Sequence, residues 1–126
     1  MAQRVLIIDD DSEFVEAVTN LLEAKNYDVD SAPNGKVGIA KAKEKRPNII
    51  LLDVMMTTKS EGFDVARELR KDDSLKKVPV IMVTGVRKEM SLPFGFEPSD
   101  TWLPVNGVLE KPVKPEVLLK TIEQNT

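Results

Sequence analysis

Residues 48–53 read NIILLD, so a run of four aliphatic residues is followed at once by a carboxylate, Asp53. An apolar run this short and unbroken, with two β-branched residues at its start, is typical of a strand that is covered on both faces. Such strands lie in the middle of parallel sheets, between layers of helices. Asp53 is therefore expected at the carboxyl end of a central strand, which is where open α/β sheets place their ligands.

A second run has the same form. Val5–Ile8 is uninterrupted and aliphatic, and Asp9, Asp10 and Asp11 follow it directly. Two buried parallel strands would bring these carboxylates to the same edge of a sheet. The sequence therefore predicts an acidic site there.

The rest of the chain alternates strand and helix patterns. The predicted strands span about residues 4–9, 27–31, 48–53, 78–83 and 108–110. The predicted helices begin at Asp11 or Ser12, at Asn34-Gly35, near Glu61 and at Pro115. The second of these has only a weak apolar stripe, formed by Val37, Ile39 and Ala40. This alternation predicts an α/β fold, a doubly wound five-stranded parallel sheet in the flavodoxin-like order 2-1-3-4-5.

The segment 86–105 departs from this alternation. Because it contains three prolines, the helix expected between the fourth and fifth strands is predicted to be shortened or replaced by a proline-rich segment. Phe94, Phe96 and Trp102, half of the six aromatic residues in the chain, also fall in this segment. They either cover the sheet face that a full helix would cover, or form a surface that binds a partner.

Length and composition exclude several classes of protein. The 126 residues predict one domain, and a net charge of −3 argues against nucleic acid as a direct partner. No apolar stretch approaches the roughly 20 residues that span a bilayer, and Met1–Arg4 leads straight into a strand without the pattern of a signal peptide. The absence of cysteine fits the cytoplasm. The absence of histidine excludes imidazole-based catalysis and a role as phosphohistidine carrier.

Polar groups follow four of the predicted strands: Asp9 and Asp10, Asp53, Thr84, and Lys111. Right-handed crossovers place all of them at one edge of the sheet. Three crowded carboxylates repel one another unless positive charge lies among them, and Lys111 supplies one such charge. Mg²⁺, which binds through a few carboxylates and keeps waters that a phosphate can replace, is the natural second. An aspartate in this setting is suited to accept a phosphoryl group covalently.

The set Asp9-Asp10, Asp53, Thr84-Gly85 and Lys111-Pro112 resembles the signature of response-regulator receiver domains, the phosphoacceptor modules of two-component signalling. The resemblance covers about residues 4–124. It implies that Asp53 is the phosphorylation site.

The resemblance also implies the remaining roles at the site. Asp10 and Asp53 would bind Mg²⁺ directly, Asp9 would act through water, and the backbone carbonyl of Met55 would be a further ligand. Thr84 would hydrogen-bond the phosphoryl group, Lys111 would pair with it, and Lys111-Pro112 would be a cis peptide. We expect these roles because these residues occupy the positions that match the family's pattern.

Some positions depart from the family pattern. Thr57 stands where a proline is usual, Gly62 comes one residue late, and Val108 replaces the aromatic switch residue. With the altered 86–105 segment, these departures imply that the usual relay and output face differ in this chain.

The expected function is a stand-alone phosphoacceptor switch rather than an enzyme. Its phosphodonor would be a histidine kinase or phosphotransfer protein, and a downstream protein would read residues 86–105. The alternative is a receiver-like scaffold that works without phosphorylation. An aspartyl-phosphate hydrolase is disfavoured, because Glu13 stands where that class needs a threonine.

Overall fold

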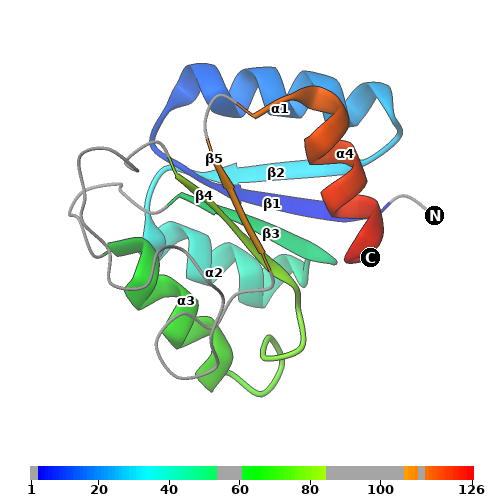
Figure 1. The fold of residues 1–126 in the computed structure, drawn as a ribbon. Helices are drawn as coiled ribbons and strands as arrows, with labels where there is room; N and C mark the ends of the chain where they lie inside the picture. The colour runs from blue at the N-terminus through cyan, green and yellow to red at the C-terminus, as the bar shows by residue number, and fades with distance from the viewer. Residues whose placement is uncertain (1–2, 54–60, 85–106, 111–112) are drawn as a thin grey trace.

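The computed structural model describes residues 3–53, 61–84, 107–110 and 113–126, and these ranges hold five strands and four helices (Figure 1). The strands are β1 (Arg4–Ile8), β2 (Asp28–Ala32), β3 (Ile49–Asp53), β4 (Val80–Thr84) and β5 (Gly107–Glu110). The helices are α1 (Ser12–Ala24), α2 (Gly35–Lys45), α3 (Glu61–Lys71) and α4 (Pro115–Gln124). All neighbouring strands are parallel and their order is β2-β1-β3-β4-β5, which confirms the predicted fold class and topology.

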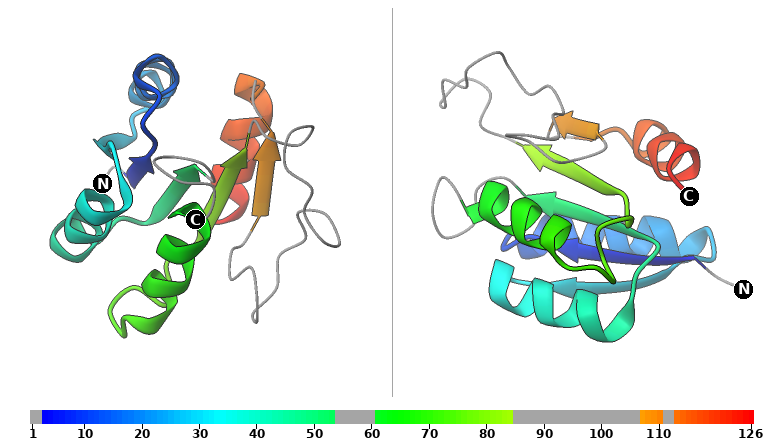
Figure 2. Two further views of the ribbon diagram at one scale, coloured as in Figure 1. Left: turned by 90° about the vertical axis from the view of Figure 1, so that its left-hand side faces the viewer. Right: turned by 90° about the horizontal axis from the view of Figure 1, so that it is seen from below.

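Helices cover both faces of the sheet. Helices α1 and α4 lie on one face, and α2 and α3 lie side by side on the other (Figures 1 and 2). Strand β3 lies at the centre of the sheet, and the side chains of residues 49–52 are at most 1% exposed. Ile50 and Leu52 belong to the core beneath α2 and α3, whereas Ile49 and Leu51 belong to the core beneath α1 and α4. This double coverage explains why the strand is apolar at every position rather than at alternate ones.

Both helices on the amino-terminal half of the chain begin where the sequence predicts. The carboxylate of Asp11 accepts hydrogen bonds from the backbone N–H of Glu13 and of Phe14, each at 3.2 Å, and so caps α1. The side-chain oxygen of Asn34 accepts one from the N–H of Val37 at 2.9 Å and caps α2. These side chains satisfy N–H groups that have no partner inside a helix.

Helix α2 follows the predicted apolar stripe only in part, because Ile39 packs against the core. Its buried residues are Gly35, Gly38 and Ala42, whereas Ala40 is exposed. A Cβ atom built on Gly38 would lie 2.6 Å from Cδ1 of Ile8. At Gly38 the helix therefore packs so close to β1 that only a glycine fits there, which a hydrophobicity pattern does not register.

Some strand boundaries also differ from the prediction. Strand β1 ends at Ile8 rather than at residue 9, and β2 spans 28–32 rather than 27–31. Strand β4 begins at Val80, after Pro79, which has no N–H to donate to a neighbouring strand. The expected irregular segment 86–105 and the loop 54–60 lie outside the described residues.

Candidate functional site

The ends of β1 and β3 bring the predicted carboxylates together. These strands are adjacent, and their last paired residues are Ile8 and Leu52, so Asp9 and Asp53 come next at the same edge. The backbone N–H of Asp9 donates to the carbonyl of Ala32 at 3.0 Å, which continues the pairing of β1 with β2. Asp9 is 3% exposed and Asp53 is 6% exposed, whereas Asp10 is exposed.

Asp9, Asp10 and Asp53 form one cluster. Each offers a carboxylate oxygen, and the three oxygens lie within 4.8 Å of one another. Negative charges this close repel strongly where water is excluded, and two of these residues are buried. A bound cation relieves this repulsion.

The chemistry of the cluster fits Mg²⁺. All three ligand atoms are carboxylate oxygens, the donors that hard divalent cations prefer. The chain contains no histidine and no cysteine, so it cannot offer the nitrogen and sulfur donors typical of zinc sites. One carboxylate of the cluster is exposed and two are buried, so the cluster has a solvent-facing side.

Asp11 contributes a contact that the sequence analysis missed. Its backbone N–H donates to Oδ1 of Asp9 at 2.8 Å, while its own carboxylate caps α1. The sequence contains a signal for this contact, because an aspartate side chain commonly accepts a hydrogen bond from the backbone N–H two residues later, in an Asx-turn. The start of α1 is thereby tied to the orientation of the Asp9 carboxylate.

The other predicted site residues are only partly covered by the structure. Thr84 is the last residue of β4 and pairs in register with Glu110 at the end of β5, so its backbone lies at the carboxyl edge of the sheet. The side chain of Thr84 lies outside the described residues, as do Met55 and Lys111. In the sequence, Lys111 directly follows the end of β5.

A comparison with known protein families shows to which family this chain belongs. The model of the response regulator receiver domain matches residues 5–123. The chain belongs to this family. Receiver domains are the signal-receiving modules of two-component systems, and phosphorylation and magnesium are typical of them. Their homologues are signalling regulators rather than classical enzymes.

Individual relatives agree with the family assignment. The chain is 35% identical to Protein PilH of Pseudomonas aeruginosa over 119 residues, which are 94% of this chain and 93% of PilH. It is 34% identical to the DNA-binding dual master transcriptional regulator RpaA of Synechocystis, where the match covers 94% of this chain and 47% of RpaA. The chain thus spans nearly all of PilH but about half the length of such DNA-binding relatives.

Solved structures share the fold. The chemotaxis protein CheY4 of Vibrio cholerae superimposes with a TM-score of 0.86 at 28% identity, over 100% of both chains. The receiver domain of sensor histidine kinase PA1611 from Pseudomonas aeruginosa, solved with a magnesium ion in its active site cleft, gives a TM-score of 0.83 at 22% identity, covering 98% of this chain and 97% of that one.

Among the helices in the described part of the chain, none has the length and apolar character that a membrane span requires.

Proposed function

We propose that this receiver domain is the phosphoacceptor of a two-component relay and that Asp53 accepts the phosphoryl group. The observation that carries the proposal is the cluster of Asp9, Asp10 and Asp53 at the ends of two adjacent central strands. Receiver domains bind Mg²⁺ at an acidic pocket of this kind and interact with histidine kinases or phosphotransfer proteins. We therefore propose a Mg²⁺-dependent transfer from phosphohistidine on such a protein.

In this reaction an oxygen of the Asp53 carboxylate bonds to phosphorus while the bond from phosphorus to the histidine nitrogen breaks. The electron pair of that bond stays with the imidazole, so the products are an acyl phosphate on Asp53 and a free histidine on the donor. Burial holds the Asp53 side chain in place for attack. The new group carries about −1.5 to −2 charges, and because it replaces the −1 charge of the ionised Asp53 carboxylate, the net change at this edge of the sheet is about −0.5 to −1.

Mg²⁺ would be held by Asp10 and Asp53, with Asp9 acting through water and the Met55 carbonyl as a further ligand. When bound, the ion neutralises charge on the phosphoryl oxygens. We assign Thr84 to a hydrogen bond with the phosphoryl group and Lys111 to an ion pair with it, on the basis of their places after β4 and β5 in the sequence.

We propose that residues 1–126 act as one domain, in the cytoplasm, which the absence of cysteine fits. A protein target would read the phosphorylated state, and residues 86–105 are our candidate for the segment that it contacts.

The test is the intact mass of the protein after incubation with a small acyl phosphate and Mg²⁺. Wild type should gain one phosphoryl group. Asp53→Asn should gain none, and omission of the metal should strongly reduce the gain. Asp11→Asn is the matched control, because it removes a neighbouring carboxylate and keeps the helix cap, so it should be phosphorylated.

Two results would overturn the proposal. One is an adduct that persists in Asp53→Asn. The other is a folded wild-type protein that binds Mg²⁺ but gains no phosphoryl group; this result would favour the alternative, a receiver-like scaffold that works without phosphorylation.

A further inference from the structure

A groove runs between α2 and α3, on the face of the sheet opposite to α1 and α4. The two helices lie side by side in Figure 2, and an open hollow of about 480 Å³ lies between them. Gly35, Ile39 and Val65 form its floor. Gly35 and Val65 are buried, and Ile39 packs against the core beneath the two helices. The floor of the groove is therefore apolar and lies against the core.

The two walls of the groove carry opposite charges. Lys36 and Lys43 line it from α2, and Asp64 and Glu68 line it from α3. All four side chains are exposed. Between the lysines, the exposed rim of α2 carries only the methyl group of Ala40. The wall formed by α2 is thus a low ridge with positive charge at both ends.

The opposite charges do not neutralise each other across the groove. Lys43 pairs outside it with Asp72 at 3.7 Å, and Asp64 pairs with Arg67 on its own helix at 3.0 Å. Within the described ranges, Lys36 and Glu68 form no ion pair. Lys36 and Glu68 are therefore available to a molecule that covers the groove, whereas Lys43 and Asp64 would exchange exposed ion pairs to meet it.

We propose that the occupant is a second copy of this chain, related by a two-fold axis that runs along the groove. Such an axis exchanges the walls, so α2 of each copy lies over α3 of the other. Lysines then face carboxylates on both sides, and the two apolar floors face each other. An axis across the groove would instead place α2 over α2 and like charges together, so charge complementarity selects one arrangement.

The register of the two helices fits this arrangement. A two-fold axis parallel to α2 and α3 keeps each residue at its own height along the groove. Lys36 and Lys43 are about 10 Å apart along α2, and Asp64 and Glu68 are about 6 Å apart along α3. Flexible lysine side chains span that difference. The low ridge at Ala40 lets α2 approach α3 of the partner closely.

The contact is expected to be weak and sensitive to salt, because its ion pairs are exposed to solvent. It does not depend on phosphorylation of Asp53. An experiment that disproves the dimer therefore leaves the proposed function untouched, and an experiment that disproves the function leaves the dimer untouched.

Sedimentation velocity over a range of protein concentrations tests the proposal. At low salt the wild type should shift from monomer toward dimer as its concentration rises, and about 0.5 M salt should weaken the dimer at least tenfold. Variant A, Lys36→Glu with Lys43→Glu, makes both walls negative. Variant B, Asp64→Lys with Glu68→Lys, makes both walls positive. Each variant alone should remain monomeric, but an equimolar mixture should form a dimer of one A and one B.

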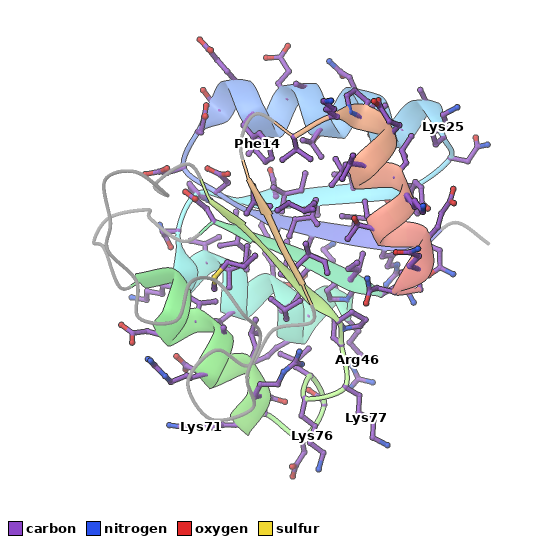
Figure 3. All side chains as sticks on the ribbon, viewed as in Figure 1. Phe14, Lys25, Arg46, Lys71, Lys76 and Lys77 are labelled. Atoms are coloured by element: carbon purple, nitrogen blue, oxygen red, sulfur yellow. The ribbon has the colours of Figure 1, made fainter. Side chains whose placement is uncertain are left out.

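The control for variant A is Lys77→Glu with Lys120→Glu, which changes the net charge equally. Lys77 lies in the loop after α3 (Figure 3), and neither control residue lines the groove. This control should dimerise like wild type. Circular dichroism and thermal unfolding establish that each variant is folded. A wild type that stays monomeric at low salt, variants that still dimerise alone, or folded variants whose mixture stays monomeric would each overturn the proposal.

Discussion

The side chains of Asp30 and Lys41 form hydrogen bonds with the backbone at the exposed edge of the sheet, in strand β2. In β2, the N–H of Asp28 and the carbonyl of Ala32 form hydrogen bonds on the side of β1. Because the backbone groups of successive residues in a strand point to opposite sides, the N–H and carbonyl of Ser31 point toward the open edge. The carboxylate of Asp30 accepts from the N–H of Ser31 at 2.8 Å, and Nζ of Lys41 donates to the carbonyl of Ser31 at 2.6 Å. Asp30 and Lys41 also pair at 3.1 Å. Two side chains thus occupy backbone groups that another strand could otherwise bind.

This arrangement makes a pH-dependent prediction. Burial alone would raise the pKa of Asp30, but the hydrogen bonds from Lys41 and Ser31 and the charges of Lys41 and Lys45 outweigh it, so the pKa lies below the ordinary 3.8. The stability that the ionised carboxylate contributes is therefore complete above the unfolded-state pKa. It is lost as the pH falls through the lower folded-state pKa.

Urea unfolding of wild type and Asp30→Asn from neutral pH to about pH 3 measures this contribution. The wild type should be the more stable protein at neutral pH, and the difference should shrink in acid. Lys41→Met should lose the part of this pH dependence that comes from Lys41, while the hydrogen bond from Ser31 and the charge of Lys45 remain. A difference that stays constant down to the lowest pH would contradict the assignment.

At the scale of an element, the short distance between α2 and the sheet decides which residue can stand at the point of closest contact, and hydrophobicity does not. Gly38 lies against Ile8, and three carbon atoms of that side chain lie within 2.9 Å of the position that a Cβ would take. Ile8 is fully buried in β1, so it cannot move out toward solvent to make room. Glycine is retained in the middle of this helix because the sheet is so close.

Gly38→Ala should therefore destabilise the protein. Overpacking costs roughly 1–3 kcal/mol, and all but the lowest part of this range exceeds the ~1 kcal/mol that alanine gains over glycine in a helix. Denaturant unfolding measures the net change. Ala40→Gly, on the exposed side of the same helix, isolates the effect of helix propensity. Adding Ile8→Ala to Gly38→Ala should cost less than the sum of the two single changes, and a more stable Gly38→Ala protein would refute the packing argument.

At the scale of the whole molecule, we expect the acidic cluster to couple metal binding to folding. Asp9 and Asp10 follow β1, whereas Asp53 ends β3, more than 40 residues away in the sequence. Their oxygens meet only when the sheet has formed. A cation that binds the cluster therefore stabilises the folded chain, and the repulsion among the carboxylates opposes folding when no cation is bound.

Thermal unfolding of Asp10→Asn with and without Mg²⁺ tests this coupling. Without metal, the variant should melt a few degrees above wild type, since a free-energy change of ~1 kcal/mol moves Tm by roughly 2–8 °C. With Mg²⁺, wild type should gain more than the variant. Asp11→Asn should behave like wild type in both conditions. Equal Mg²⁺-dependent shifts in wild type and Asp10→Asn would exclude Asp10 as a ligand.

The sequence by itself determined the fold class, the strand order and the set of acidic residues at the sheet edge. The apolar runs before Asp9 and Asp53 indicate two buried strands, and the capping residues Asp11 and Asn34 mark where helices begin. These signals are local or periodic, so they can be read along the chain without knowing which segments touch.

Only the tertiary structure decided which face α2 buries, how the Asp9 carboxylate is held by Asp11, and that the α2–α3 groove has oppositely charged walls. Each of these depends on the distance between segments that are brought together by folding. Glycine at residue 38 carries no hydrophobic signal, yet it sets how closely a helix approaches the sheet. Hydrophobic periodicity records which residues avoid water, whereas packing distance and the pairing of charges across helices exist only once the chain has folded.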